Sequence, residues 1–545
     1  MSENEFDFIV VGGGSAGCLL ANRLSADPRN RVVLLEAGGG DKNPLIKMPI
    51  GFTRLMYDEK VTNIYKTEPE PELNGREVSA PRGRVLGGCS SINGMIYTRG
   101  QRGDYDEWAA LPGCDGWSYD ELLPYFRRPE HFEVESGNPY HGDSGELNVK
   151  HVEMKYPITD VYMDAAESVG IKRLEDINGA SQNGIGYMQV TMKDGCRWSS
   201  ADAFLSPEVR RRSNLSIVLN AAARRVLLDG KRATGVEYQD RKGEVQQVHA
   251  KREVILAAGA YNSPPLLEMS GIGGRDALDA IGVELVHELE GVGENLQDHI
   301  QLWVQYGVKT KKTLSEDGKF PKVVLNVFRY LFTKTGPLAM PAANVGAFVS
   351  SEDGGRPIFQ LHFTPGAGGM DDKGNMVATP EPGVNSTVCV IRPTSRGSVH
   401  ARSCDPKERP KIVHNYLSTE QDKKLSIEGF KLQRRIYESD VFQEHATHEI
   451  LPGPSVQTDA EILDFWRKEA MSTYHPVGSA KMGASDDPSA VVDNELRVHG
   501  IEGLRVVDCS VFPLIPSGNT HAPVVAVADR AADLILGKPV LQPGA

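Results

Sequence analysis

With 545 residues the chain is too long for one hydrophobic core, and its length predicts two domains. Its net charge of −13 and pI of about 5.6 exclude the cationic surface that nucleic-acid binding requires. The sequence has no apolar run long enough to span a bilayer, no secretion signal at its start and only seven scattered cysteines, a pattern that predicts a cytoplasmic protein with reduced thiols and no metal site.

The first elements of the chain predict a βαβ unit that binds a dinucleotide. An apolar strand over residues 6–11 runs into a G-x-G-x-x-G turn, a helix-like run follows, and a second apolar strand over 31–35 ends at an acidic residue. The glycines permit the tight turn, the close approach of a pyrophosphate and helix–strand packing, and the acid can accept hydrogen bonds from a ribose. The residues predicted to bind here are Gly12, Gly14, Ser15, Ala16, Gly17, Glu36 and Ala37.

This turn fits NAD and FAD equally well, and a second glycine-rich stretch over residues 81–100 separates them. It combines glycines with short hydroxyl side chains and an amide, which suits a backbone that lies against a flat heteroaromatic ring and hydrogen-bonds its edge. A nicotinamide enzyme has no need of such a segment. The stretch therefore predicts a flavin, with contacts from Gly87, Ser91, Asn93, Gly94 and Met95.

The same stretch resembles the first signature of the glucose–methanol–choline (GMC) oxidoreductases. Residues 259–273 resemble the second signature, and further matches follow in family order at residues 291–299, 474–483, 506–510 and 518–523. The likeness is strongest to bacterial choline-dehydrogenase-like and alcohol dehydrogenase members. It implies an α/β and α+β fold, with a Rossmann-like, noncontiguous FAD-binding domain and a substrate domain of antiparallel sheet flanked by helices.

The resemblance also implies how the chain is divided. Residues 1–155, 195–310 and 480–545 are expected to form the FAD-binding domain, and residues 156–194 and 311–479 the substrate-binding domain. Short buried strands are predicted over 215–219 and 253–258, and a closing helix over 522–536. Further cofactor contacts are expected from Ala223, Ala258, Asp508, Cys509 and Pro523.

Two histidines are candidates for the chemistry. Oxidation of an alcohol needs a base for the hydroxyl proton, and neutral imidazole suits that task. His475 precedes Pro476, which favours an extended loop conformation, and the resemblance implies that it is the general base. His521 is expected to orient the substrate oxygen or to share the base role. Most other histidines, among them His131, His141, His362 and His400, are predicted to be structural.

Two departures from the family pattern alter what the resemblance implies. Ile92 stands where some members carry the histidine that attaches FAD covalently, so the FAD is predicted to be noncovalent. Residues 342–348 contain no acid, although a quaternary ammonium needs carboxylates or aromatic faces around it. This second departure argues against choline as the substrate.

Residues 320–332 form an apolar run that is interrupted by a lysine and an arginine, and two interpretations of it stay open. A helix packed on the substrate domain is the ordinary one. The other is a surface helix in peripheral contact with the inner face of a membrane, where a quinone could collect electrons.

The leading hypothesis is FAD-dependent oxidation of a primary alcohol to the aldehyde, with a quinone or dye-like carrier as electron acceptor. An alcohol oxidase that uses O2 and makes hydrogen peroxide is the nearest alternative. A hydroxynitrile lyase, or another non-redox activity on the same fold, is the alternative from a different class. The sequence identifies neither the alcohol nor the oligomeric state.

Overall fold

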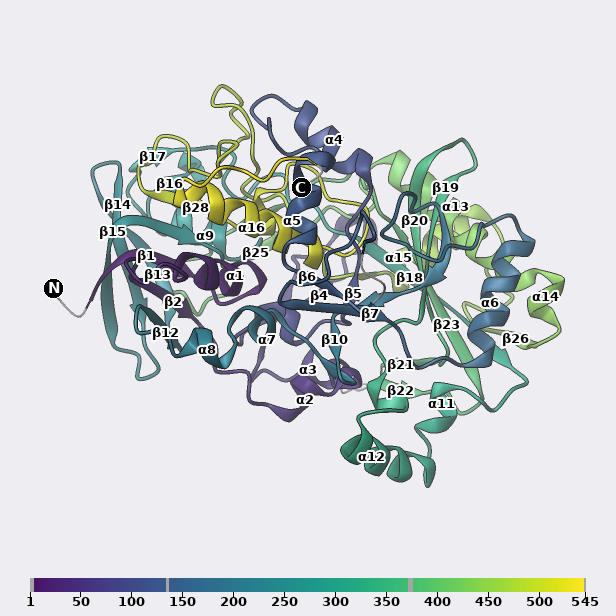
Figure 1. Cartoon of the computed structure of the whole chain (residues 1–545). Coiled ribbons are helices and arrows are strands. Elements are labelled where there is room, and N and C mark those ends of the chain that lie inside the picture. Colours follow the sequence, from purple (N-terminus) through teal and green to yellow (C-terminus); the bar gives the residue numbers. More distant parts are fainter. Residues whose placement is uncertain (1–3, 134–136, 371–375, 544–545) are drawn as a thin grey trace.

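The computed structural model describes residues 4–133, 137–370 and 376–543, so the outermost residues of the predicted FAD domain and a short piece of the predicted substrate domain lie outside it. Two large sheets organise these residues, and they lie at opposite ends of the molecule in Figure 1. The predicted site motifs converge between them. The mixed α/β and α+β architecture that was expected is confirmed.

The first sheet contains the predicted dinucleotide-binding unit. Its strands run in the order β12-β2-β1-β15-β14-β13, with β28 paired to β15. β1, β2, β12, β15 and β28 pair in parallel, whereas β13, β14 and β15 pair antiparallel. The strands are β1 (Glu5–Val11), β2 (Val32–Glu36), β12 (Leu215–Leu219), β13 (Ala222–Asp229), β14 (Arg232–Gln239), β15 (Val245–Leu256) and β28 (Leu504–Val506).

The strand predicted over 215–219 exists as β12, but only its first residue is buried. β12 is the edge strand of the sheet, so its outer side has no neighbouring strand to cover it. The strand predicted over 253–258 is the inner end of β15, which ends two residues earlier, at Leu256; its last three residues are buried as expected.

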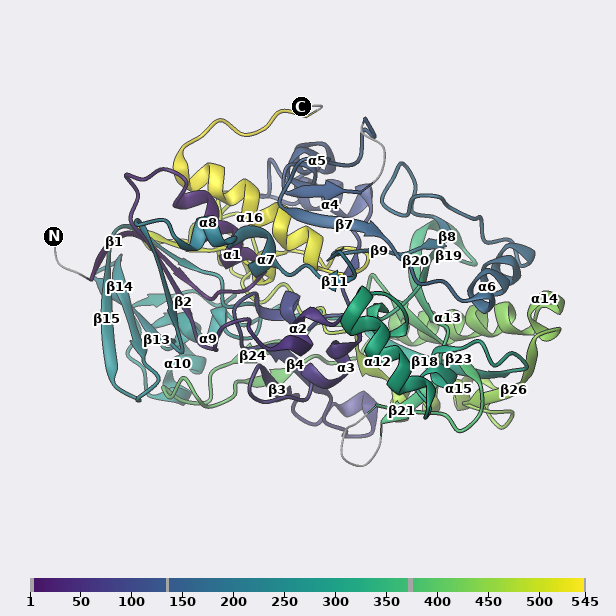
Figure 2. The ribbon, with the colours of Figure 1, turned by 60° about the horizontal axis from the view of Figure 1, so that its bottom comes forward.

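Two buried helices pack together in this first layer. α1 (Ser15–Leu24) and α16 (His521–Leu536) pack against each other, and their small and aliphatic residues are almost wholly buried; Figure 2 shows α16 crossing the molecule as the yellow helix. The fully buried Asp529 of α16 pairs with Arg23 of α1 at 2.9 Å and with Arg128 at 2.5 Å. α16 is therefore tied to its neighbours by charge as well as by packing, and it forms the closing helix that was predicted.

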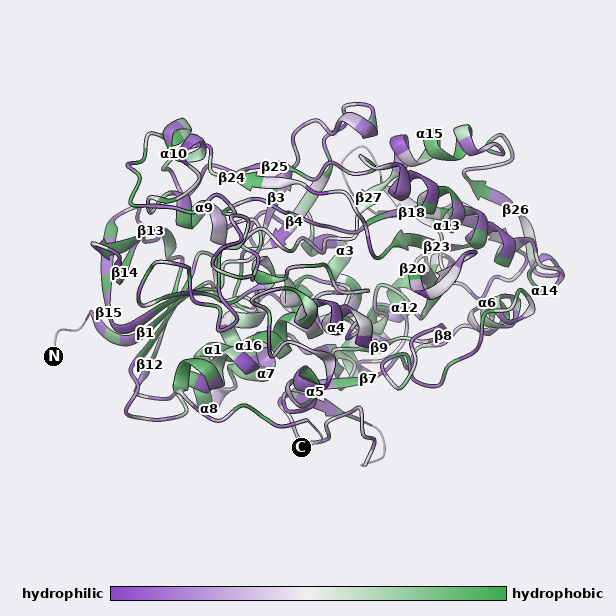
Figure 3. Cartoon of the chain, turned by 90° about the horizontal axis from the view of Figure 1, so that it is seen from above, coloured by the Kyte–Doolittle hydropathy of each residue, from purple (hydrophilic) through white to green (hydrophobic). Residues whose placement is uncertain are grey.

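The second sheet is antiparallel and is covered by helices, as expected for the substrate domain. Its order is β26-β18-β23-β20-β19-β8, with β27 paired to β18. α6, α13 and α15 pack beside it, and α13 alternates between hydrophobic and hydrophilic residues in Figure 3, as a helix with one covered face does. The strands are β8 (Gly184–Tyr187), β18 (Ile300–Val308), β19 (Val345–Ser351), β20 (Gly354–Thr364), β23 (Gly383–Val390), β26 (Ala446–Leu451) and β27 (Met471–Ser472).

One predicted domain boundary differs from the structure. Residues 300–308 were assigned to the FAD domain, but β18 pairs with β23, β26 and β27 of the second sheet. The chain therefore enters the second layer at about residue 299. The choice of sheet depends on partners far along the chain, which the local pattern of a strand does not reveal.

Short strands and helices connect the two layers. The strands pair as β3 (Thr62–Lys66) with β4 (Ser79–Gly83), β10 (Met192–Lys193) with β11 (Cys196–Arg197), β16 (Ile272–Gly273) with β17 (His287–Glu288), β21 (Gly368–Met370) with β22 (Met376–Ala378), β24 (Ser398–His400) with β25 (Lys411–Val413), and in the order β5 (Ile96–Tyr97), β9 (Gln189–Val190), β7 (Leu147–His151), β6 (Glu130–Phe132). The remaining helices are α2 (Pro44–Lys47), α3 (Phe52–Leu55), α4 (Arg102–Ala110), α5 (Tyr119–Arg127), α6 (Pro157–Ser168), α7 (Ser200–Phe204), α8 (Pro207–Arg210), α9 (Ser263–Glu268), α10 (Arg275–Ile281), α11 (Leu314–Asp317), α12 (Lys322–Thr333), α13 (Glu420–Glu438), α14 (Asp440–Gln443) and α15 (Asp459–Glu469).

The helix predicted over 320–332 forms as α12, but it does not pack into the substrate domain as the ordinary interpretation expected. Tyr330 is its only buried residue. α12 lies at the lower edge of the molecule in Figure 1, beside α11 and the β21–β22 hairpin. Within the described residues, no helix is long and apolar enough to cross a membrane.

Candidate active site

The first glycine-rich turn has the geometry that a bound pyrophosphate needs. A Cβ on Gly12 would lie 2.4 Å from the carbonyl oxygen of Ala257, and one on Gly17 would lie 1.8 Å from that of Gly12, so both positions require glycine. A Cβ on Gly14 would meet nothing within 4 Å, which leaves space in front of α1. Gly14 also gives no side-chain cap, so the first N–H groups of α1 are available to an anion.

Glu36 and Ala37 follow directly at the end of β2. The carboxylate of Glu36 accepts hydrogen bonds from the N–H of Gly13 at 2.8 Å and of Gly38 at 2.7 Å. Burial raises the pKa of Glu36 to about 7. The chain enters β13, which contains Ala223, from Ala221, whose N–H donates to the carbonyl of Glu36 at 2.8 Å. These contacts hold the end of β2, with Glu36, against the first glycine turn and against the residues that lead into β13.

The second glycine-rich stretch lies directly on the first. The N–H of Gly87 donates to the carbonyl of Gly13 at 2.7 Å, and a Cβ on Gly88 would stand 2.7 Å from the Cα of Gly14. The hydroxyl of Ser91 donates to the carbonyl of Leu86 at 2.8 Å and stabilises this turn. The two glycine-rich stretches, which are far apart in the sequence, therefore pack directly against each other.

Beyond Ser91 the chain turns around the buried guanidinium of Arg197. Arg197 donates to the side-chain oxygen of Asn93 at 2.7 Å, and that oxygen also accepts from the N–H of Met95 at 3.0 Å. Met95 has a positive φ of 65°, and a Cβ on Gly94 would collide with Ala342. Burial lowers the pKa of Arg197 to about 9, and one of its terminal nitrogens has no hydrogen-bond partner. The sequence analysis did not identify this residue.

Asp508 and its neighbours close the cleft from below α16. The Asp508 carboxylate accepts from the N–H groups of Gly259 and Ser510 and from the hydroxyl of Ser263. The N–H of the neighbouring Ala258 donates to the same Ser263 hydroxyl at 3.1 Å. Asp508 thus holds the β15–α9 turn, and its carboxylate is occupied by the chain itself. Cys509 follows it, and Pro523 lies in the first turn of α16, where a missing N–H is tolerated.

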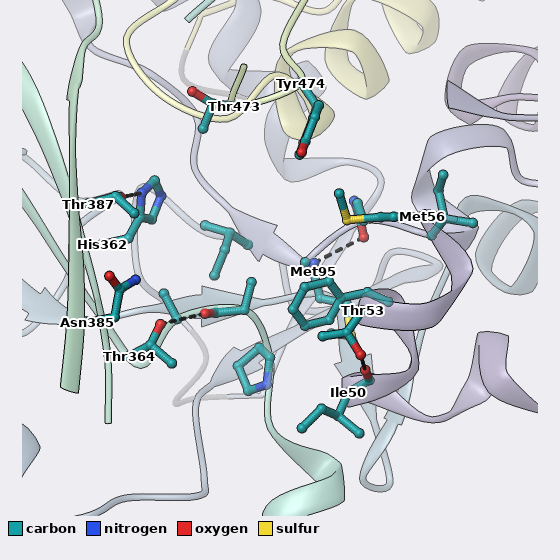
Figure 4. Close-up of a pocket in the computed structure, with 18 of the residues that line it drawn as sticks. Ile50, Thr53, Met56, Met95, His362, Thr364, Asn385, Thr387, Thr473 and Tyr474 are labelled. Carbon is teal, nitrogen blue, oxygen red and sulfur yellow. Dashed lines mark hydrogen bonds between the residues drawn. The ribbon is translucent and has the colours of Figure 1, made fainter. Parts of the chain in front are cut away.

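A cavity of about 670 Å³ continues from this cleft into the second layer. The predicted residues Ser15, Asn93, Gly94, Met95, Cys509, His475 and His521 line it. Figure 4 shows Met56 and Tyr474 facing His362 and Thr387 across it. The open space at Gly14, the terminal nitrogen of Arg197 that has no hydrogen-bond partner, and the size of this cavity all fit a large dinucleotide with a flat ring system.

His475 faces an amide that the sequence analysis did not single out. Its Nε2 lies 3.0 Å from the side-chain nitrogen of Asn519, and its Nδ1 lies 3.1 Å from the Nδ1 of His299. The loop is held by Asp298, which accepts from the N–H of His475 at 2.7 Å. The other oxygen of Asp298 accepts from the hydroxyls of Tyr416 and Ser472, each at 2.5 Å. The backbone of His475 is thus fixed to the second layer.

These contacts determine which nitrogen of His475 carries its proton. The carbonyl of Ile391 can only accept, so the Nε2 of His299, 3.1 Å away, must donate to it. Burial lowers the pKa of His299 to about 4, so His299 is neutral and its Nδ1 accepts. His475 must then donate from Nδ1. Burial, aided by nearby His299, His362 and Arg82, lowers the pKa of His475 well below its usual range, so its Nε2 is unprotonated and its lone pair can accept a hydrogen bond.

The amide of Asn519 is oriented consistently with this assignment. Its oxygen accepts from the side-chain amide of Gln360 at 3.1 Å, which turns its NH2 group towards His475. The N–H of Asn519 donates to the hydroxyl of Thr98 at 2.8 Å. An N–H donor and an imidazole lone pair therefore meet at one point of the cavity wall, the arrangement that a substrate hydroxyl requires.

His521 lines the same cavity but does not contact His475. Its Nε2 lies 3.0 Å from the hydroxyl of Ser200, and its Nδ1 is buried without a partner. Burial, together with the charge of Arg197, lowers the pKa of His521 to about 4. His521 is the first residue of α16, so it stands where the positive end of the helix dipole meets the cleft.

Three further residues of the site were not predicted from the sequence, two in the cavity wall and one, His299, buried behind His475. His362 was predicted to be structural, but it lines the cavity and lies 3.2 Å from the hydroxyl of Thr387. Asn519 and His299 both lie within quoted motifs, 518–523 and 291–299, yet a motif does not show which of its members face each other. A paired amide and imidazole would have been the signal to look for.

Comparison with known proteins settles the family. The GMC oxidoreductase family models match residues 6–301 and 393–528, which together cover most of the chain. The chain belongs to the GMC oxidoreductase family. This confirms the resemblance and the prediction of FAD as the cofactor, and it makes the protein an oxidoreductase acting on CH–OH donors.

Two curated relatives match over nearly their full length. An oxygen-dependent choline dehydrogenase of Vibrio vulnificus is 43% identical, covering 99% of this chain and 96% of its own. An alcohol dehydrogenase [acceptor] of Pseudomonas putida is 41% identical, covering 98% and 96%. Among solved structures, pyridoxine 4-oxidase from Mesorbium loti has a TM-score of 0.87 at 31% identity, covering 97% of this chain and 98% of its own. An Aspergillus oryzae formate oxidase variant has a TM-score of 0.91 at 26% identity, covering 98% and 99%.

Proposed function

We propose that this protein oxidises a primary alcohol to the aldehyde, with His475 as the general base. The observation that carries the proposal is the pairing of His475 with Asn519 in the cavity wall, at 3.0 Å. FAD, when bound, supplies the two-electron acceptor that takes the hydride from the alcohol carbon. The side chains of the protein remove the hydroxyl proton and stabilise the negative charge on the oxygen.

A substrate hydroxyl placed against this pair gives its proton to the Nε2 of His475 while Asn519 donates to its oxygen. The neutral imidazole is ready to accept, because its Nδ1 already holds a proton that donates to His299. The amide stabilises the negative charge that develops on the oxygen. Asp298 accepts from the backbone N–H of His475 at 2.7 Å and so keeps the ring in place during the transfer. In this proposal Asn519 orients the alkoxide. His521, which lines the same cavity, contacts the bound cofactor.

The acids of the cavity wall favour an uncharged alcohol with an apolar chain over choline, whereas its aromatic rings, from Phe52, Tyr57, Trp303 and Tyr474, suit either substrate. Asp317 is the only acid among the described residues that line the cavity. Its carboxylate accepts from the hydroxyl of Tyr156 at 2.9 Å and lies 3.6 Å from the ammonium group of Lys322. A carboxylate so occupied is a poor partner for a quaternary ammonium. Towards the mouth the wall is aliphatic, with Leu314, Val323 and Leu338.

For the electron acceptor we propose a quinone or a similar carrier. The acceptor-linked alcohol dehydrogenase of Pseudomonas putida supports this choice, whereas the oxygen-dependent relatives support the oxidase alternative. An oxidase differs from a quinone-dependent dehydrogenase in that it forms hydrogen peroxide. Turnover that forms stoichiometric hydrogen peroxide in air, with no gain in rate from a quinone analogue, would identify an oxidase.

The test is flavin reduction without oxygen. The purified holoenzyme is mixed anaerobically with a panel of primary alcohols of increasing chain length, with choline as the matched charged substrate. We expect medium-chain alcohols to bleach the flavin and choline to bleach it much more slowly. Rapid bleaching by choline alone would overturn the substrate proposal, and a flavin that no alcohol reduces would overturn the redox proposal in favour of lyase chemistry.

A further inference from the structure

α12 presents an apolar face to solvent. Five residues form this face on one side of the helix, namely Val324, Leu325, Phe328, Leu331 and Phe332, with exposed fractions between 42% and 84%. Phe320, just before the helix, is also 84% exposed. Most exposed large hydrophobic side chains of the described residues belong to this one segment. Such a concentration marks a binding surface rather than ordinary surface composition.

The helix is held so that this face points outward. The buried hydroxyl of Tyr330, on the opposite side of α12, donates towards the carbonyls of Lys47 and Gly195, each at 3.3 Å. Asn326 donates to the carbonyl of Asp317 at 3.0 Å. These contacts anchor the polar side to the body. The apolar face cannot turn inward without breaking them.

The charge around α12 is opposite to that of the whole protein. Residues 309–334 contain seven lysines and arginines and two acids, although the chain has a net charge of −13. Both acids are already paired, Glu316 with Lys319 and Asp317 with Lys322. Two of the basic residues, Lys322 and Arg329, are on α12 itself, three residues before and four residues after Leu325, so they lie next to the apolar face. Because salt screens charges beyond about 8 Å, the acidic remainder of the protein does not cancel this local attraction.

The same helix forms part of the mouth of the active-site cavity. Val323 and Val327, on the inner flank of α12, line the cavity, as do Leu314 from α11 and Val377 from the β21–β22 hairpin. Figure 2 shows α12 and β21 close together on the side brought forward. The exposed face and the cavity mouth are therefore two flanks of one helix.

We propose that α12 docks into the interface of a lipid bilayer with anionic headgroups, with the cavity mouth turned towards the membrane. An apolar face of Phe and Leu beside Lys and Arg is the composition of helices that lie in the interfacial plane. A second copy of this chain fits less well, because one short helix face is small against the 1,200–2,000 Å² or so that stable interfaces bury. Resting on the proposed function, the docked state supplies apolar alcohols from the membrane phase.

The experiment is vesicle flotation of the holoenzyme, without substrate. Vesicles of phosphatidylcholine are compared with equimolar phosphatidylcholine and phosphatidylglycerol. We expect binding to the anionic vesicles that weakens with added salt. The variant Leu325→Ser/Phe328→Ser should bind at least about tenfold more weakly. Neutralising Lys322 and Arg329 to Gln should weaken binding about fivefold per residue at low salt.

Val245→Ser is the matched control, since Val245 is an exposed valine of the first sheet, 47% exposed and away from the cavity. It should bind like the wild type. Equal binding of the α12 variants and the wild type, or no vesicle binding by the wild type, would overturn the proposal. So would a dimer in lipid-free buffer that Leu325→Ser/Phe328→Ser converts to a monomer. Flavin bleaching by a short soluble alcohol should be unchanged in that variant, so a failure of the alcohol proposal would be seen separately.

Discussion

Replacing His299 tests the proton assignment on which the proposed mechanism depends. His299 is fully buried and touches neither the flavin cleft motifs nor Asn519; it acts through its Nδ1, 3.1 Å from His475. In His299→Leu the proton on Nδ1 of His475 loses its acceptor. A buried donor without a partner costs about 1–3 kcal/mol, so the imidazole shifts its proton to Nε2 or turns. Either change removes the lone pair that faces the alcohol.

The expected magnitude follows from that cost. About 1–3 kcal/mol corresponds to a loss of about 5- to 150-fold in kcat/KM. The loss should stay below the effect of removing the base altogether, which is about 10²- to 10⁴-fold. His299→Asn is the matched variant, because its side-chain oxygen restores an acceptor close to the position of Nδ1. We expect it to recover most of the activity.

The assay is anaerobic flavin reduction by an alcohol, with FAD content and thermal unfolding measured on each variant. A role limited to packing would slow both variants equally, or in proportion to their loss of stability. That outcome would refute the assignment, as would a Leu variant with the wild-type rate. Faster reduction in the Asn variant than in the Leu variant, at equal FAD content, is the result that the geometry requires.

Five further outcomes are expected. His475→Ala should retain FAD but lose about 10²- to 10⁴-fold in turnover, and Asn519→Ala about 10²- to 10³-fold, both measured by anaerobic bleaching. Because the base must be neutral and its pKa is lowered, kcat/KM for the wild type should stay level as pH falls through 6.5 and decline only below it. Acid precipitation should release FAD into the supernatant, since Ile92 offers no attachment point. Pairing with Glu268 raises the pKa of His400 to about 9, so His400→Gln should cost about 1.5–3 kcal/mol below pH 6.5 and progressively less as pH rises through 9, as read from urea unfolding.

The cofactor half of the site could be predicted because its signals are local. Strand, glycine turn, helix and acid lie within one short stretch, and each glycine has a steric reason that the structure reproduces at Gly12 and Gly17. The contact between Gly13 and Gly87 was not visible in the sequence, since it joins two turns through folding. The first stretch nevertheless predicted a dinucleotide and the second a flat ring system, which together were enough to predict a flavin.

The catalytic half was harder, because its members are distant in the chain. His299 and His475 are 176 residues apart, and nothing in either motif indicates that the two rings meet. Asn519 and His521 illustrate a different difficulty. Near a helix start, residues two apart point in different directions, so only one of the two can face a given wall. The sequence predicted the start of α16 to within one residue, but it could not indicate that Asn519, before the helix, is the one facing His475.

α12 shows that periodicity identifies a face but not what covers it. The pattern of residues 320–332 is equally suited to a packed helix and to an exposed one, and the packed helix was the ordinary expectation. The outcome depended on Tyr330 and Asn326, whose side chains donate to backbone carbonyls outside α12. Long-range anchoring of this kind leaves no trace in the local pattern.

The proposed chemistry lies at the seam between the two layers. Gln360 of β20, His299 at the start of β18 and Ile391 at the end of β23 belong to the second sheet, and they orient His475 and Asn519. Asn519 in turn leads into α16, which packs on α1 beside the flavin cleft. The distance from base to cofactor is thus set by how one sheet sits on the other. The hydrogen bonds that orient the base run from Gln360 through Asn519, His475 and His299 to Ile391, and no residue of the first glycine turn takes part in them. Substitutions that shift one sheet relative to the other should therefore slow proton transfer while leaving FAD bound.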